Sequence, residues 1–444
     1  MIWELFESNF HHACDDVAII RTSTCFSWQD IHEEAKNNYE NLSNLSGKRV
    51  GLIFNVNSTG FGLIAAFEKL NANVFLLDAD STEKQVLHIA NEFELNAIVD
   101  TKNNRTDVNI LSTTGESTQD ASVTILTSGT TGKPKAVKHT WQSLSAPTRK
   151  TNSKGRWLLT YRPQLYAGLQ VILQAFVNGA AIAAYENNRP PNEIVSFMAD
   201  SQVAFVSSTP SFWRRIFLTV ATEEISRLDL SQITLGGEIV DQALLSQLKS
   251  CFPSTRIIHI YATTELGRCF SVSNGEEGFP ASYLKDGPDG VQLKVENDEL
   301  CVRSKNSMTG YDKLSGVQSN TSNDDWFRTG DLVKVENDRV LFQGRDSDII
   351  NVGGNKVNPL LVESEIREVP SVADVRVYGI SSSIAGQIVA CDVVVKEDCE
   401  SSEVESQIRT RCIEKLDRFH VPRIIKSVDE IKLNSAGKTK RSDS

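Results

Sequence analysis

Short apolar runs alternate with segments of helical periodicity through the first part of the chain. Residues 48–56, 72–77 and 97–99 are short and apolar, which predicts buried strands. Residues 58–70 and the stretch after Ser81 carry apolar positions at helical spacing, and Ser81 is the expected N-cap of the second helix. Strands that alternate with helices favour a parallel sheet with crossover helices, so this part is predicted to be α/β.

Further along, the same alternation returns and then gives way to other patterns. Residues 101–122 are polar and are predicted to form a loop, whereas 165–261 again alternate between helix and strand. From about residue 290 the pattern consists of short strands and turns, which predicts a small β subdomain. The last hundred residues, after Gly344, pair helical and strand patterns and are long enough for a separate domain.

The predicted fold class is therefore α/β. We expect a large N-terminal domain of α/β sheets plus a small β subdomain, residues 1–343. A small α+β C-terminal domain, residues 344–444, is expected to follow it, mobile about the polar stretch GRDSD at its start.

Composition narrows the classes of function. The chain has 444 residues, of which 40% are hydrophobic and 23% charged, as in ordinary globular proteins, so a disordered or coiled-coil protein is excluded. The formal net charge of −11 opposes binding to nucleic acid, and no nucleic-acid partner is expected. An anionic substrate would need a local basic site.

Cysteine spacing and hydropathy bear on the compartment. The eight cysteines are scattered without a CxxC pair, which argues against a zinc site and favours a reducing compartment. The first residues lack the features of a secretory signal, and polar residues interrupt the most apolar long stretch, 167–185. We therefore expect a cytoplasmic protein without a membrane span.

The segment TSGTTGKPK, residues 127–135, is the first motif with chemical meaning. Its glycines let backbone N–H groups approach a phosphate, its hydroxyls add donors and its lysines add charge. It is not a Walker A loop, because Pro134 follows the Gly–Lys pair, and no Gly-x-Gly-x-x-Gly occurs. Composition alone leaves a flexible loop as the alternative.

This segment resembles the phosphate-binding motif of the adenylate-forming superfamily. That superfamily includes acyl- and aryl-CoA synthetases, carrier-protein ligases, the adenylation domains of peptide synthetases and firefly-type luciferases. The resemblance implies that the phosphates of ATP are held by the residues of this motif, namely Thr127, Ser128, Gly129, Thr130, Thr131, Gly132 and Lys135.

Further motifs follow in the order of the family. Residues 261–265, YATTE, resemble the Tyr-Gly-x-Thr-Glu motif, with Ala262 in place of glycine. The resemblance implies that Tyr261 belongs to the nucleotide site, that Thr264 contacts the α-phosphate and that Glu265 binds Mg²⁺. A hard cation prefers carboxylate and phosphate oxygens, which agrees with that role. Taken alone, a Thr-Glu pair would more often be a helix cap.

The C-terminal motifs supply the remaining expected functional residues. The segment WFRTGDL resembles the Thr-Gly-Asp motif, which implies that Asp331 binds the ribose hydroxyls. GRDSDII resembles the family's hinge, so that Arg345 would contact the ribose and Ser347 would stand at the hinge position, where Asp or Lys is usual. The glycines that follow, Gly353 and Gly354, would line the path of the thiol, and NSAGK resembles the motif of the catalytic lysine, here Lys438.

The acid site is assigned from weaker resemblances. The expected acid-binding residues are Tyr166, Gly168, Ser208, Gly236, Gly237 and Ala262, and Gly237 is also expected to contact the nucleotide. For Tyr166 the alternative is an aromatic side chain packed in the core. The segment PQLYAGL contains no acidic residue, whereas amino-acid-activating relatives carry an Asp there to bind the ammonium group.

The resemblance implies ATP-dependent activation of an acyl or aryl acid as the acyl-adenylate, and then transfer to a thiol. The thiol would belong to CoA or to the phosphopantetheine of a separate carrier protein, and Mg²⁺ would accompany ATP. A stand-alone amino-acid adenylating enzyme, an enzyme that stops at or oxidises the adenylate, and a non-catalytic nucleotide-binding homologue are the alternatives. The intact lysines, carboxylates and Arg345 argue against the last of these.

Overall fold

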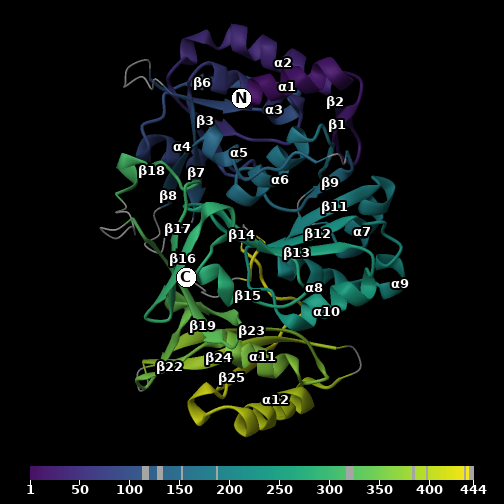
Figure 1. Cartoon of the computed structure of the whole chain (residues 1–444), viewed down its shortest axis with the longest axis vertical. Helices are drawn as coiled ribbons and strands as arrows, with labels where there is room; N and C mark the ends of the chain where they lie inside the picture. The colour runs from purple at the N-terminus through teal and green to yellow at the C-terminus, as the bar shows by residue number, and fades with distance from the viewer. Residues whose placement is uncertain are drawn as a thin grey trace.

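The structure is a computed structural model. It describes residues 1–112, 120–127, 134–151, 154–186, 189–316, 325–382, 386–396, 399–434 and 437–439. Helices and sheets of the large part occupy the upper two thirds of Figure 1, and the small C-terminal part lies below them. The predicted α/β class, with a small β subdomain and an α+β C-terminal part, is confirmed.

Two large sheets form the N-terminal part, and neighbouring strands in their centres are parallel. The first has the order β18 (Gly310–Tyr311), β8 (Lys135–Thr140), β7 (Ser122–Thr127), β4 (Asn73–Leu77), β3 (Arg49–Ile53), β5 (Ala97–Asp100) and β6 (Asp107–Ile110). The second has the order β14 (Gly267–Val272), β13 (Arg256–Thr263), β12 (Gln232–Gly236), β11 (Val203–Ser208), β9 (Arg156–Leu159), β10 (Ile182–Ala183), β1 (Val17–Ile20) and β2 (Cys25–Ser27).

Helices cover these sheets and bury their apolar faces. One core cluster joins the two sheets through α1 (Ile2–Ala13), α2 (Trp28–Asn41), α3 (Ser58–Lys69) and α6 (Tyr166–Val177). A second lies beneath α7 (Pro191–Asp200), α8 (Pro210–Thr219), α9 (Thr222–Ile225) and α10 (Gln242–Cys251), and a third beneath α4 (Glu83–Glu92). The short helix α5 (Trp141–Ser145) follows β8. Burial of these apolar side chains is the main stabilising term of the fold.

The β subdomain and the C-terminal part each have their own core. The subdomain is an antiparallel sheet with the order β15 (Phe279–Pro280), β20 (Arg339–Arg345), β19 (Phe327–Glu336), β17 (Glu299–Arg303) and β16 (Gln292–Glu296). In the C-terminal part, α11 (Pro359–Arg367) and α12 (Ser401–Lys415) pack on a sheet of β22 (Asn355–Val357), β21 (Ile350–Val352), β24 (Gly386–Val395), β23 (Val372–Ser382) and β25 (Ile424–Ser427).

Two local predictions were wrong. The N-cap of α4 is Thr82 rather than Ser81, because the Thr82 side chain and Gln85 form a reciprocal capping box. The predicted loop at 101–122 contains β6, which pairs antiparallel with β5 at the edge of the first sheet. All four residues of β6 are exposed. The strand therefore lacks the run of buried apolar residues by which the other strands are recognised in the sequence.

Two further observations concern the cysteines and the helices. None of the eight cysteines forms a disulfide. Within the described ranges no helix is both long and apolar enough to cross a bilayer.

Candidate active site

The hairpin of β7 and β8 holds the two ends of the predicted phosphate loop. Thr127 is the last residue of β7, and its register partner is Lys135, the first residue of β8. The two residues therefore lie side by side where the loop leaves and returns. The remaining residues predicted for this loop, Ser128, Gly129, Thr130, Thr131 and Gly132, lie outside the described residues.

The turn between β13 and β14 carries Thr264 and Glu265. The backbone oxygen of Thr264 accepts a hydrogen bond from Nε2 of His139 at 2.7 Å, and the backbone oxygen of Glu265 accepts one from the N–H of Met308 at 2.7 Å. The hydroxyl of Tyr311 donates to Oε1 of Glu265 at 3.3 Å. Burial lowers the pKa of His139, which favours a neutral ring with its proton on Nε2. Contacts from three segments thus fix this turn.

The surroundings of Glu265 fit a magnesium ion that arrives with a nucleotide. Within the part of the chain that the structure describes, no group of three or more His, Cys, Asp or Glu side chains could hold a metal ion by itself. Magnesium is usually bound by one or two carboxylates together with substrate phosphates and water. The Glu265 carboxylate accepts a hydrogen bond from the neutral hydroxyl of Tyr311 and has capacity to serve as such a ligand.

Asp331 lies at the centre of a connected polar group. Its carboxylate accepts a hydrogen bond from the hydroxyl of Tyr261 and one from Nε of Arg345, the latter at 2.9 Å. The ring of Tyr261 is held by stacking against Phe270 and Phe342, each with a centroid distance of 5.2 Å. Burial raises the pKa of Asp331, and the neighbouring Arg345 opposes that shift. The carboxylate is thus oriented by fixed donors at the edge of the large domain.

The C-terminal tail places Lys438 in the large domain, far from the sheet that precedes it in sequence. A Cβ added at Gly237 would lie 3.1 Å from Cε and 3.7 Å from Nζ of Lys438. The backbone of Gly237 has a φ of +85°, which favours glycine, so this position suits the approach of the lysine side chain. Figure 1 shows the yellow tail leaving the small domain and running up towards β14 and α8.

The charges that act on Lys438 belong to three residues of the predicted nucleotide site and to Glu238. Burial, followed by the positive charge of Arg345, lowers the pKa of Lys438. The carboxylates of Asp331 and Glu265 act in the opposite direction, as does that of Glu238. Of the predicted residues, Gly237 therefore lies next to the side chain of Lys438. The charges of Asp331, Arg345 and Glu265 act on the amine of that lysine.

The residues predicted for the acid lie at the carboxyl ends of parallel strands in the second sheet. Ser208 ends β11, Gly236 ends β12 and Ala262 belongs to β13. The side chain of Ser208 is fully buried, and within the described residues its Oγ has no hydrogen-bond partner. Ligands of open α/β sheets bind outside such strand ends, which agrees with the predicted location.

Tyr166 and Gly168 lie in the first turn of α6. The side chain of Tyr166 is buried, with its ring 5.9 Å from that of His139, and burial raises the pKa of its hydroxyl. A Cβ at Gly168 would lie 2.2 Å from the carbonyl oxygen of Arg162, so this glycine permits the close packing of α6 on the preceding loop.

The predicted hinge and thiol-path residues are on the small domain's side of the chain. Ser347 lies in a short, exposed 3₁₀ turn between β20 and β21, and its Oγ donates to Asp348 at 3.2 Å. Gly353 and Gly354 form the exposed turn between β21 and β22, with φ values of +58° and +90°. A Cβ at either glycine would meet no heavy atom within 4 Å. The structure does not bring these two glycines to Lys438.

Three residues of this region were absent from the predicted site. His139 donates a hydrogen bond to the backbone oxygen of Thr264. Thr209 donates from Oγ1 to the carbonyl oxygen of Gly437 at 3.0 Å. Glu238 accepts a hydrogen bond from the N–H of Thr439 at 2.7 Å. A Thr followed by Pro at a helix start indicates an N-cap, and Thr209 is indeed the N-cap of α8. No local pattern in the sequence indicates that Thr209 and Glu238 would contact the tail.

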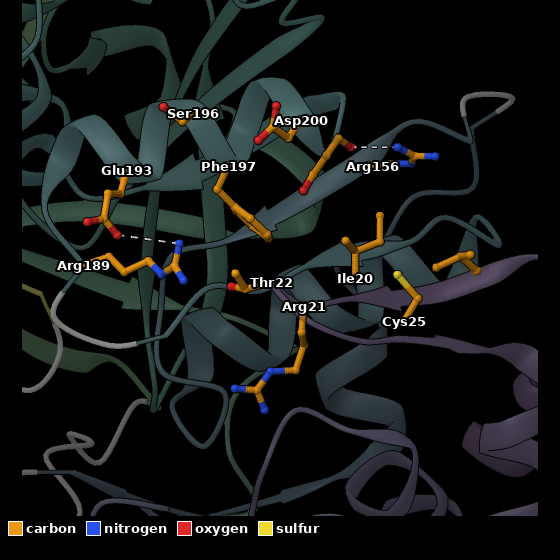
Figure 2. A pocket seen from close by; sticks show the side chains of 12 residues that line it. Ile20, Arg21, Thr22, Cys25, Arg156, Arg189, Glu193, Ser196, Phe197 and Asp200 are labelled. Atoms are coloured by element: carbon orange, nitrogen blue, oxygen red, sulfur yellow. Dashed lines mark hydrogen bonds and ion pairs between the residues drawn. The ribbon is translucent and has the colours of Figure 1, made fainter.

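A groove of about 460 Å³ lies elsewhere, between β1 and α7 (Figure 2). Its lining includes Arg21, Arg156 and Arg189. Arg156 donates to the carbonyl oxygen of Ser201, and Arg189 pairs with carboxylates of neighbouring residues, as the dashed line to Glu193 shows. None of the residues predicted from the motifs lines this groove, so it is separate from the candidate active site.

Comparisons with known proteins agree with this geometry. Residues 111–312 match the family of AMP-binding enzymes, and residues 361–438 match the AMP-binding enzyme C-terminal domain. A 2-succinylbenzoate–CoA ligase of Bacillus licheniformis is 27% identical over 340 residues, which cover 72% of this chain and 69% of that protein. One of Staphylococcus epidermidis is 22% identical, with 96% and 94% covered.

A solved structure shows that the fold is shared along the whole chain. The anthranilate CoA ligase AuaEII in complex with anthranoyl-AMP has a TM-score of 0.80 at 18% identity, with 99% of this chain and 95% of that chain covered. The two matched segments together span more than half of the sequence and include the motif of Lys438. The chain therefore belongs to the AMP-binding enzymes of the adenylate-forming superfamily.

Proposed function

We propose that this protein is an AMP-forming acid–thiol ligase, which activates an acyl or aryl acid with ATP and transfers it to a thiol. The observation that carries the proposal is the position of Lys438. The tail brings this lysine against Gly237 and within the electrostatic reach of Asp331, Arg345 and Glu265. A cation there suits a reaction between a carboxylate and a phosphate ester, because both reactants are anions in an acidic protein.

In the first step, an oxygen of the carboxylate attacks the α-phosphorus of ATP and pyrophosphate leaves. The protein contributes positions and charges rather than a covalent intermediate. Lys438 bridges the carboxylate and the α-phosphate, and Thr264 contacts that phosphate. Asp331 and Arg345 hold the ribose, while Thr127, Lys135 and the loop between them hold the outgoing phosphates. Glu265 would hold Mg²⁺, which would supply positive charge that neutralises the phosphates.

In the second step, a thiol attacks the carbonyl carbon of the adenylate and AMP leaves. We propose that the region from residue 344 onward rotates about Ser347, which withdraws Lys438 from the site. The turn at Gly353 and Gly354 then approaches the adenylate and lines the path of the thiol. The thiol belongs to CoA, as in the names of the relatives, or to the phosphopantetheine of a separate carrier protein.

An aromatic acid is the first substrate to test. Two of the similar proteins are named for 2-succinylbenzoate and one for anthranilate. The strand ends that would face the acid carry small residues, namely Ser208, Gly236 and Ala262. The segment PQLYAGL offers no carboxylate for an ammonium group, so a free amino acid is disfavoured. The free cysteines support a cytoplasmic location.

Carboxylate-dependent release of pyrophosphate from MgATP tests the function. We expect release with aryl acids such as 2-succinylbenzoate and anthranilate, and AMP release that becomes faster when CoA is added. Amino acids serve as the contrasting class. Adenylate formation without any response to CoA or to a phosphopantetheinylated carrier would contradict thiol transfer. ATP binding without pyrophosphate release for any acid would favour the non-catalytic alternative.

The substitution Asp331→Asn is expected to weaken nucleotide binding. An asparagine keeps one acceptor oxygen, but its NH₂ group would face either Tyr261 or Arg345, both of which donate. Hydrogen bonds to charged groups contribute about 1.5–3 kcal/mol, so we expect KM for ATP to rise by about 10-fold or more. Steady-state kinetics with varied ATP would measure this.

The substitution Tyr261→Phe is the matched control for Asp331→Asn. It removes one donor from Asp331 and keeps the carboxylate and its contact with Arg345. A smaller rise in KM for ATP is therefore expected. An Asp331→Asn enzyme with the original KM for ATP would show that this carboxylate does not bind the nucleotide.

A further inference from the structure

Glu238 connects the large domain to the tail that carries Lys438. One oxygen of its carboxylate, Oε2, accepts a hydrogen bond from the backbone N–H of Ser211 at 3.0 Å. The other oxygen, Oε1, accepts one from the backbone N–H of Thr439 at 2.7 Å. Ser211 lies in the first turn of α8, whereas Thr439 directly follows Lys438. The carboxylate thus bridges two backbone segments that are far apart in the sequence.

The tail segment around Lys438 is itself a closed hairpin. Leu433 and Thr439 form an antiparallel bridge, and the N–H of Asn434 donates to the carbonyl oxygen of Lys438 at 2.8 Å. The side-chain oxygen of Asn434 accepts from the N–H of Lys438 at 3.1 Å. Because these bonds fix the backbone at Lys438, whatever holds the hairpin also sets the position of the lysine side chain.

Contacts from the large domain hold this hairpin on both sides of the lysine. Thr209 donates from its hydroxyl to the carbonyl oxygen of Gly437, the residue before Lys438. Glu238 accepts from Thr439, the residue after it, and the hydroxyls of Ser211 and Thr439 lie 3.3 Å apart. Of these three contacts, the one through Glu238 involves a charged group, and such hydrogen bonds are roughly twice as strong as neutral ones.

We propose that Glu238 is a positioning residue, which docks the Lys438 hairpin on the large domain for adenylate formation. The inference rests on the proposed function. Glu238 itself need not touch the acid or the nucleotide, since it acts through the backbone of Thr439. Its bond to Ser211 lies within the large domain and orients the carboxylate, whereas its bond to Thr439 must break when the tail withdraws for thiol transfer.

The substitution Glu238→Gln separates this role from the general stability of the fold. Glutamine is nearly the same size, but its one acceptor oxygen can serve either Ser211 or Thr439, and its NH₂ group would then face a backbone donor. We expect pyrophosphate release with 2-succinylbenzoate to slow by about 10- to 100-fold, the range of a lost hydrogen bond to a charged group. CoA-dependent breakdown of chemically prepared 2-succinylbenzoyl-adenylate is expected to keep its original rate.

Hydrogen exchange at the tail measures docking without any reaction. In the unmodified chain the N–H of Thr439 is bonded to Glu238 and is expected to be protected. Glu238→Gln should increase exchange in a peptide that contains residues 433–439. Unchanged exchange would overturn the proposed docking, whether or not 2-succinylbenzoate proves to be a substrate. The exchange result therefore stands apart from the test of the proposed function.

A second variant removes the same contact from the other partner. Thr439→Pro removes the backbone N–H that donates to Glu238. Residue 439 lies in the tail and is not part of the buried hydrophobic core. It should slow adenylate formation and spare thiol transfer, as Glu238→Gln does. Glu224→Gln, which removes one exposed carboxylate from α9, is the matched control and should change neither step. If Glu238→Gln slows both steps equally, its carboxylate only stabilises the start of α8 and the proposal is wrong.

Discussion

Replacing Lys438 by alanine is expected to slow carboxylate-dependent pyrophosphate release by about 10²- to 10³-fold, the usual effect of removing one preorganised donor from a charged transition state. The structure supplies the reason, because the lysine side chain passes Gly237, and the charges of Arg345, Asp331 and Glu265 in the proposed nucleotide site act on its amine. Its cation would face the charge that develops between the carboxylate and the α-phosphate.

The fold should survive this substitution. Lys438 belongs to a tail hairpin and to none of the described hydrophobic clusters, so the melting temperature is expected to change little. Lys432→Ala removes an exposed lysine from the same tail and is the matched control. Near-original pyrophosphate release in Lys438→Ala, measured under single-turnover conditions, would exclude a role of this lysine in adenylate formation.

The substitution Ser347→Pro is expected to separate the two half-reactions. Ser347 lies in the short connection between β20 and β21, where a change in a few backbone dihedrals would rotate the small domain. Proline locks φ at 347 and restricts Asp346 before it, and a backbone conformation that conflicts with proline costs about 3 kcal/mol. If the second arrangement needs such a conformation, thiol transfer slows by about 100-fold.

Adenylate formation should continue in Ser347→Pro, because the arrangement with Lys438 in the site is the one that the structure shows. Rapid-quench measurements of pyrophosphate release and of CoA-dependent AMP release report the two steps separately. Ser347→Ala keeps the backbone freedom and removes only the hydroxyl that contacts Asp348, so it should leave both rates unchanged. Equal loss of both steps in the proline variant would contradict the hinge.

The architecture was largely predictable because its central strands are buried on both faces. All five residues of β4 are buried. A short, mostly apolar run of this kind is typical of a strand inside a parallel sheet. The antiparallel additions at the sheet edges were harder to recognise. β6 is exposed throughout, and in β8 the polar residues Lys138 and His139 directly follow Ala136 and Val137, so neither strand forms a continuous apolar run.

The motifs predicted which residues bind the nucleotide, and the structure shows how some of these residues lie relative to one another. Asp331 and Arg345 are bonded to one another, and the ends of the phosphate loop meet at Thr127 and Lys135. The acid side was less predictable. Gly168 allows α6 to pack closely against the backbone of Arg162. From the sequence alone, a glycine needed for such packing looks the same as a glycine that lines a binding site.

The amino-acid sequence determined the elements, the order of the motifs and the family, since each depends on local spacing and residue type. Only the tertiary structure decided where Lys438 stands and what holds it there. Glu238 and Thr439 are separated by 201 positions, and their contact depends on how a polar tail docks on the start of α8. A few hydrogen bonds from side chains of the large domain to the tail set that docking, and hydrogen bonds of this kind leave no periodic pattern in the chain.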